Sequence, residues 1–232
     1  MNRTLDVATS LAASIARFGT GLRASGLGKR PDKLLELYEF EACPFCRKVR
    51  EALTILDLEA MIYPCPRGGE RFRPIVEQKG GKLQFPYLVD PNEGVAMYES
   101  DDIVEHLFRT YGDGRVPVTL KLGPVTTGSA LAASAWRPNR GRRAVPSRAP
   151  EKPLELWSFE ASPFCRIVRE KLSELELPYR LHNVAKGSPS RQAFIARSGK
   201  MMVPFLHDPN TDVDMFESAD IVAHLERTYA AR

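Results

Sequence analysis

Cysteine is scarce in this sequence, with four in 232 residues, and neither sign of charge dominates. So few cysteines do not make a disulfide-rich secreted scaffold. They also leave a structural zinc site, which needs about four ligands, short of donors. The net charge of +4 is too small to indicate nucleic-acid binding by itself. We therefore expect no metal, no nucleic-acid partner, and reduced cysteines in a cytoplasmic or similarly reducing compartment.

Long apolar runs are also missing. No run approaches the roughly 18 residues that a membrane-spanning helix needs. The N-terminal region has no compact apolar core followed by a small-residue cleavage site, so we expect no secretory signal. The hydrophobic content of 43% is instead that of one or two ordinary globular domains.

The most informative stretch is Cys43–Cys46, with the sequence Cys-Pro-Phe-Cys. Alternating apolar residues at 34–40 predict a strand before it, and apolar residues at helical spacing from Val49 to Leu58 predict a helix after it. Cys43 then faces the free N–H groups at the helix start, which favour the reactive thiolate. We expect Cys43 to be the nucleophile. Cys46, one turn later, either resolves a mixed disulfide or only packs.

The residues that follow predict the rest of one domain. We expect a second strand, a short helix, two further strands and a closing helix, at residues 60–63, 71–79, 85–92, 95–98 and 99–111. Ser100 or Asp101 suits the N-cap of the closing helix. The predicted order is β-α-β-α-β-β-α, with the first two strands parallel.

After residue 115 the chain begins again. Residues 154–169 repeat 35–50 with Ser162 in the place of Cys43, and residues 203–210 repeat 85–92. An apolar helical pattern and an arginine-rich stretch precede each copy. We therefore predict four segments: an amphipathic helix and basic tether, a first domain, a helix with an Arg-rich linker, and a second domain, at residues 1–33, 34–114, 115–152 and 153–232.

The two leading segments leave alternatives open. Residues 1–33 are interpreted as a helix packed on a domain and followed by a glycine-rich tether. The alternatives are peripheral membrane contact through residues 1–30, or an organelle-type leader. The arginines at 137–148 lie among proline, glycine and serine, which predicts a solvated linker. An anion- or lipid-facing patch is the alternative.

With its Cys-Pro-Phe-Cys and the proline at Pro86, the first copy resembles the thioredoxin-like domain of glutaredoxins and of the N-terminal half of glutathione transferases, and the second copy repeats its frame with Ser162 and Pro204. The double arrangement resembles the tandem glutathione S-transferase N-terminal-domain proteins. The fold class that this resemblance implies is α/β, with two tandem thioredoxin-like domains. Ordinary glutathione transferases continue into an all-helical domain that builds the electrophile pocket. The second copy takes that place here, so the resemblance does not extend to conventional conjugation.

The resemblance implies glutathione as the ligand and assigns positions to it. Pro86 matches the proline that is cis and faces the active cysteine, and the backbone of Phe85 holds the peptide. Glu99 and Ser100 match the pair that holds the γ-glutamyl end, and Arg67 is placed to reach the glycyl carboxylate. The predicted binding residues are Phe45, Arg67, Phe85, Pro86, Glu99 and Ser100 in the first copy, and Ser162, Lys186, Val203, Pro204, Glu217 and Ser218 in the second.

The expected function is that of a glutathione-binding thiol–disulfide oxidoreductase or transferase-like enzyme acting through Cys43. Serine is a poor nucleophile without an activating base, so the second copy is expected to bind without redox turnover. Two alternatives stay open. One is a non-catalytic glutathione-binding scaffold. The other is an isomerase on a lipophilic substrate, because residues 43–50 also resemble membrane-associated prostaglandin E synthase type 2.

Overall fold

The computed structural model describes residues 7–11, 20–121 and 140–231. Each repeat has the predicted order β-α-β-α-β-β-α. The elements of repeat 1 are β1 (Leu35–Glu39), α2 (Pro44–Ile55), β2 (Ala60–Pro64), α3 (Arg73–Gly80), β3 (Tyr87–Asp90), β4 (Val95–Met97) and α4 (Ser100–Tyr111), followed by the short α5 (Val118–Lys121). Those of repeat 2 are β5 (Leu154–Ser158), α7 (Pro163–Glu174), β6 (Tyr179–Asn183), α8 (Arg191–Ser198), β7 (Phe205–Asp208), β8 (Val213–Phe216) and α9 (Ser218–Tyr229).

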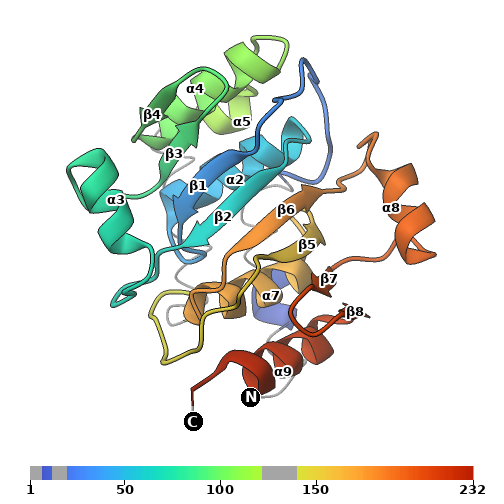
Figure 1. Ribbon diagram of the computed structural model, residues 1–232. Coiled ribbons are helices and arrows are strands. Elements are labelled where there is room, and N and C mark those ends of the chain that lie inside the picture. Colours follow the sequence, from blue (N-terminus) through green and yellow to red (C-terminus); the bar gives the residue numbers. More distant parts are fainter. Residues whose placement is uncertain (1–6, 12–19, 122–139, 232) are drawn as a thin grey trace.

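The two repeats share one eight-stranded sheet, in the order β4-β3-β1-β2-β6-β5-β7-β8 (Figure 1). Within each repeat the first two strands are parallel and the outer strands antiparallel. The repeats meet where β2 pairs antiparallel with β6, from Ala60↔Leu181 to Ile62↔Tyr179. We call this β2–β6 junction the seam. The two predicted domains are therefore halves of a continuous sheet.

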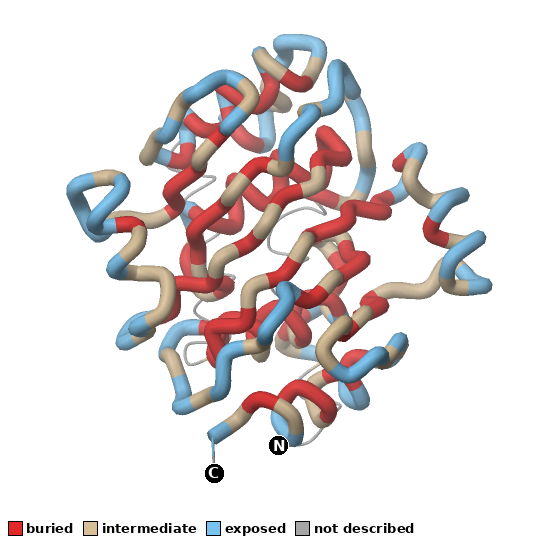
Figure 2. Tube along the Cα trace, viewed as in Figure 1, coloured by how far each residue is buried: buried red, intermediate tan, exposed pale blue. Residues whose placement is uncertain are grey.

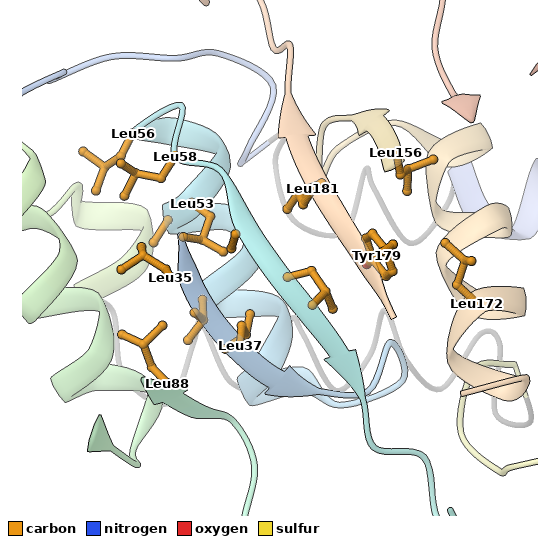
Figure 3. Close-up of a cluster of buried hydrophobic side chains, with 14 of the residues drawn as sticks. Leu35, Leu37, Leu53, Leu56, Leu58, Leu88, Leu156, Leu172, Tyr179 and Leu181 are labelled. Atoms are coloured by element: carbon orange, nitrogen blue, oxygen red, sulfur yellow. The ribbon is translucent and has the colours of Figure 1, made fainter. Parts of the chain in front are cut away.

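One face of the sheet carries the main hydrophobic core. Strand alternation points Leu35 and Leu37 of β1 toward α2 and α4, and Leu154 and Leu156 of β5 toward α7 and α9. All four leucines are fully buried. Figure 3 shows that the cluster continues across the seam through Tyr179 and Leu181. The red segments of Figure 2 follow the central strands and the helices behind them. The two halves thus share one core.

The opposite face is covered at its flanks by α3 and α8 (Figure 1). Each of these helices closes a small aromatic cluster against its own repeat. The Tyr38 ring stacks on Tyr63 at 4.7 Å, and at the matching place in repeat 2 the Trp157 ring stacks on His182 at 4.2 Å. The repeats therefore share packing details as well as topology.

A buried charge network joins the repeats beneath the sheet. Arg50 of α2 donates to Glu160 of repeat 2 at 3.0 Å, and Arg169 of α7 donates to Glu41 of repeat 1 at 3.0 Å. Arg50 also binds Glu39 of β1, and Arg169 binds Glu160 at 2.8 Å. All five side chains are at most 4% exposed. A buried charge is tolerated only with a partner and hydrogen bonds, so the network makes each repeat depend on the other.

The basic stretches before each domain are ordered arms that cross between repeats. Arm 1 (residues 20–30) bonds to Lys186 of repeat 2 and then returns to repeat 1, where Ser25 N–H donates to the Ile55 carbonyl at 2.8 Å. Arm 2 (residues 140–150) bonds to Arg67 of repeat 1 and then returns to repeat 2, where Val145 N–H donates to the Glu174 carbonyl at 2.8 Å. The exchange is reciprocal.

In the described part of the predicted solvated linker 137–148, residues 140–148, most side chains are exposed as expected, but hydrogen bonds to both repeats order the backbone. Their composition does not order alone, but repeat 1 supplies partners for the backbone. Of the predicted leading helix in residues 1–33, residues 7–11 are helical, and the Ser10 hydroxyl donates to the Pro163 carbonyl at 2.8 Å. The remainder of that helix and its counterpart near residue 130 lie outside the described residues. In the part of the chain that the structure describes, no helix combines the length and apolar character needed to cross a membrane.

Candidate thiol and ligand site

Cys43 is the N-cap of α2, where β1 gives way to the helix. Its φ and ψ of −75° and 121° are extended, Pro44 opens the helix, and the thiol accepts the Cys46 N–H at 3.3 Å. No acidic residue lies in the first turn of α2. An N-cap side chain takes up one of the free N–H groups of the first turn, and the same donors and the helix dipole stabilise a thiolate. The geometry expected of a reactive cysteine is present.

The two cysteines of the motif differ in their chemistry. The hydrogen bond from the Cys46 thiol lowers the pKa of Cys43, and the N–H groups of Cys46 and Phe45 add to this against the opposing effect of burial. Burial raises the pKa of Cys46 well above its ordinary value, and its thiol is fully buried. Cys43 is 5% exposed and neighbours the exposed ring of Phe45. Cys43 is thus the better nucleophile.

Cys65 lies in the aromatic cluster beneath α3, with its thiol bonded to the Tyr63 carbonyl. Burial raises its pKa, and the Glu39 carboxylate raises it further. A buried thiol with a raised pKa is unreactive. These surroundings are those of an incidental free cysteine, not of a third redox thiol.

Both predicted prolines follow cis peptide bonds, Phe85–Pro86 in repeat 1 and Val203–Pro204 in repeat 2. The Phe85 ring meets Phe40, just before the thiol motif, edge to face at 6.1 Å. The Arg73 guanidinium lies over the Phe85 ring, 5.0 Å from its centroid. The proline that was matched to the family position therefore has the predicted conformation.

The start of α4 differs from the prediction. The N-cap is Glu99, not Ser100 or Asp101, and Ser100 is the first helical residue. Glu99 has a left-handed φ of 62°, and its carboxylate accepts the Gln84 amide at 2.5 Å instead of capping the helix. Glu217 has the same conformation in repeat 2, with φ 65°. This backbone turns each glutamate outward and leaves the following serine buried at the helix start.

In repeat 2 four of the six predicted ligand positions line one cavity of about 170 Å³, and Ser162 and Lys186 are not among its lining residues. Its walls include Val203, Pro204, Glu217 and Ser218, together with two residues that the sequence did not single out, Phe164 and Met202. Ser162 reproduces the Cys43 geometry, because its hydroxyl accepts the Cys165 N–H at 3.3 Å. The Ser162 hydroxyl thus takes the place of the thiol at the start of α7.

Polar contacts around the repeat 1 site are lost in repeat 2. Lys48 binds Asp101 at the start of α4, where the second copy has Ile167 and Ala219. Gln84, which binds Glu99, corresponds to Met202. These side chains were missed because a motif match gives the backbone frame but not the residues around it. Comparing the two copies position by position was the signal that could have found them.

Arg67 and Lys186 lie beyond the ends of β2 and β6, in turns that the arms cross. Cys65 N–H donates to the Glu39 carbonyl at 2.6 Å, so the ends of β1 and β2 meet at the edge that holds Cys43. Among the described residues, no group of three or more His, Cys, Asp or Glu side chains is arranged to hold a metal ion. The site thus offers thiol, hydroxyl and cationic groups.

A family model for the glutathione S-transferase N-terminal domain matches residues 37–117 and 156–232, more than half of the chain. Among solved structures, the chain is similar to a Bombyx mori glutathione transferase, with 25% identity and a TM-score of 0.33 over 36% of this chain. It covers 38% of that enzyme's length. It is also similar to a Leishmania glutathione transferase described as uniquely trimeric, with 13% identity and a TM-score of 0.30, over 85% of this chain and 69% of that one. A search of curated proteins returned no match.

Proposed function

Because the chain belongs to the glutathione S-transferase N-terminal-domain family, we propose that it is a glutathione-dependent thiol–disulfide oxidoreductase acting through Cys43. One observation carries the proposal. Cys43 alone combines the N-cap position, the hydrogen bond from Cys46 and a lowered pKa. The matching position in repeat 2 keeps the geometry but holds a hydroxyl.

The reaction is two successive thiol–disulfide exchanges. The Cys43 thiolate attacks the glutathionyl sulfur of a mixed disulfide, forms a Cys43–glutathione disulfide and expels the other thiolate, which takes up a proton. The thiolate of a second glutathione then attacks the glutathionyl sulfur on Cys43. Glutathione disulfide leaves and the Cys43 thiolate is restored. The net reaction consumes one glutathione thiol: the mixed disulfide and one glutathione become the substrate thiol and glutathione disulfide, and Cys43 is regenerated.

The second exchange is assigned to glutathione and not to Cys46. Attack requires a thiolate, and the Cys46 thiol is fully buried with a raised pKa. Cys46 instead donates the hydrogen bond that favours the Cys43 thiolate. Cys46 therefore acts as a positioning residue. Attack by Cys46 on the mixed disulfide, which the sequence also allowed, is the minor route.

Repeat 2 is proposed to bind the same class of ligand without redox turnover. Its cavity brings together the cis-proline segment at Val203–Pro204 and the Glu217–Ser218 pair. In the described chain the Ser162 hydroxyl bonds to the Cys165 N–H and not to a base, and an unactivated hydroxyl does not attack disulfides. Binding through repeat 2 is also the feature that a non-catalytic scaffold would use.

The test is a disulfide-reductase assay with glutathione and a small mixed disulfide, on wild type and on Cys43→Ser, Cys46→Ser and Cys165→Ser. We expect Cys43→Ser to lose activity by at least about a hundredfold, and Cys46→Ser to keep most of it. Cys165→Ser is the matched control, because Cys165 is the equally buried inner cysteine of repeat 2. Equal activity of wild type and Cys43→Ser would remove the thiol mechanism and leave the binding scaffold.

A further inference from the structure

Two pairs of cations lie side by side where the arms cross the repeats. Arg143 of arm 2 forms a parallel bridge with Arg67, and Arg23 of arm 1 forms a parallel bridge with Lys186. Residues paired in this way carry their side chains on the same side of the ladder. All four residues are exposed. Each pair combines one residue of each repeat.

The backbone holds both pairs in the same way. Arg67 N–H donates to the Arg142 carbonyl at 2.7 Å, and Ala144 N–H donates to the Arg67 carbonyl at 3.0 Å. Around Lys186, its N–H donates to the Leu22 carbonyl at 3.1 Å, and Ala24 N–H donates to its carbonyl at 2.8 Å. The cation pairing therefore belongs to the arm exchange itself, since it occurs once on each side of the seam.

Within the described chain no carboxylate forms an ion pair with Arg23, Arg67, Arg143 or Lys186. Like charges placed directly opposite one another are destabilising. By contrast, Arg50 and Arg169 of the buried charge network both have glutamate partners. Two unpartnered cation pairs at matched positions therefore fit a site whose anion comes from outside the chain.

Both pairs lie at the edge of the sheet where the ligand is proposed to bind. Arg67 follows β2 and Lys186 follows β6, and in parallel units the carboxyl ends of neighbouring strands face the same ligand space. Two adjacent cations suit a carboxylate, because a guanidinium donates two parallel hydrogen bonds to it. Glutathione ends in such a group, the glycyl carboxylate.

We infer that each cation pair binds the glycyl carboxylate of the peptide ligand held in the same repeat, so that Arg143 completes the repeat 1 site and Arg23 completes the repeat 2 site. This inference rests on the proposed function for the identity of the ligand. It adds two binding residues from outside the matched domains. It also makes each ligand site a composite of both repeats.

The test measures protection of Cys43 from iodoacetamide by S-methylglutathione, which has no free thiol, and by its glycine ethyl ester. Cys43 reports on repeat 1 alone. Wild type should be half-protected at a lower concentration of the acid than of the ester. Arg143→Gln should need about tenfold more of the acid, as expected for one charge-assisted hydrogen bond, and should distinguish acid from ester less strongly than wild type does, because Arg67 remains.

Two controls carry the same change of charge. Arg142→Gln alters the neighbouring exposed arginine of arm 2, whose side chain alternates away from Arg67. Arg23→Gln alters the pair that serves repeat 2. In both variants S-methylglutathione should protect Cys43 at the same concentration as in wild type. Because removing one of two like charges does not weaken the fold, the melting temperature of Arg143→Gln should equal or exceed that of wild type.

The inference would be overturned if S-methylglutathione protected Cys43 in Arg143→Gln as well as in wild type, or if Arg142→Gln weakened the protection equally. The proposed function would still stand in either case. Absence of protection in wild type itself would contradict glutathione binding, and the inference with it. The two failures are therefore distinguishable.

Discussion

At the scale of single residues, the Cys43 thiol and the Ser162 hydroxyl occupy matched environments. Their backbone angles agree within 3°, at φ −75° and −72° with ψ 121° in both, and each accepts an N–H three residues on at 3.3 Å. At the helix start itself the repeats therefore differ in one atom, sulfur or oxygen. The backbone around Ser162 is already that of the Cys43 position.

We predict that Ser162→Cys gains a second reactive thiol, because the helix start of α7 supplies the same N–H donors as that of α2. In a Cys43→Ser background, iodoacetamide should modify residue 162 with a midpoint below the ordinary cysteine value of about 8.5. Peptide mass spectrometry locates the label. A midpoint at or above that value would show that the helix start alone does not activate a thiol here.

A second prediction concerns Glu39. The hydrogen bonds that lower the pKa of Cys43 are opposed by burial and by the Glu39 carboxylate. Burial raises the pKa of Glu39 itself to about 7, so this carboxylate acquires its charge as the pH rises through neutrality. Glu39→Gln should therefore speed alkylation of Cys43 by about threefold above pH 7 and leave it unchanged well below pH 7.

Glu36→Gln is the control for this change. Glu36 is on the same strand, β1, but on the opposite, half-exposed face, where it binds Lys79. Its removal should leave the alkylation profile of Cys43 unchanged at every pH. A faster reaction of Glu39→Gln that is constant across the pH range would indicate altered access to the thiol instead of a charge effect.

At the scale of elements, the arms begin at glycines that touch the charge network. Gly141 has a φ of +64°, and a Cβ there would lie 2.9 Å from the Cβ of Glu41 and 3.1 Å from the Cα of Glu170. Gly21 meets the Cβ of Glu160 in the same way, at 3.0 Å. Each arm can start only where a residue without a side chain lets it approach the other repeat.

We predict that Gly141→Ala destabilises the fold more than Gly199→Ala does. Both glycines have a left-handed φ, which costs a residue with a side chain about 1–2 kcal/mol, but Gly199 faces open space. The clash with Glu41 and Glu170 should add about 1–3 kcal/mol for Gly141→Ala. Urea unfolding of the two variants measures the difference. Equal losses would show that the arm shifts away from the network without cost.

Element order was well predicted from the sequence, and element surroundings were not. Apolar spacing located β1, α2 and their repeats, because each buries one face against its own domain. The same spacing placed Arg47 and Arg50 between the apolar positions of α2, which is the pattern of a solvent-exposed helix face. Both are buried, since α2 has charged partners from repeat 2. A partner that is distant in the sequence leaves no periodic signal.

At the scale of the whole molecule, the seam could not be predicted either. The strand pattern at Ala60–Tyr63 is the same whether β2 is an edge strand or pairs with β6. The site prediction fared better for its backbone frame, with Cys43 at the helix start and both prolines cis. It did not pair Arg143 with Arg67 or Arg23 with Lys186, because these neighbours arise only through the exchange of the arms.

The buried charge network makes the stability of the fold depend on pH. Burial disfavours the charge of Glu160, but Arg169, Arg50 and the other arginines lower the pKa of this carboxyl to about 2, from an ordinary 4.5. A carboxyl whose pKa is depressed on folding contributes stability that is present above about pH 4.5 and lost as the pH falls toward 2. The free energy of unfolding of wild type should therefore fall steeply below pH 4.5.

Glu160→Gln tests this dependence. At pH 7 it should lose about 3–5 kcal/mol, as expected when one member of a buried ion network is removed. Its remaining stability should fall less steeply than that of wild type between pH 4.5 and 3. Glu105→Gln changes an exposed glutamate of α4 and should keep the wild-type slope. Parallel slopes for wild type and Glu160→Gln would assign the acid sensitivity to other carboxyls.

The seam also has a consequence for ancestry. Its two sides are the same segment of each repeat, paired antiparallel, and the arms cross it reciprocally. This is the geometry of a two-fold symmetric dimer, so a single-repeat forerunner would have assembled through the same strand and the same arms. In such a homodimer any substitution appears twice. In a single chain the two copies are free to differ, as the thiol of Cys43 and the hydroxyl of Ser162 do.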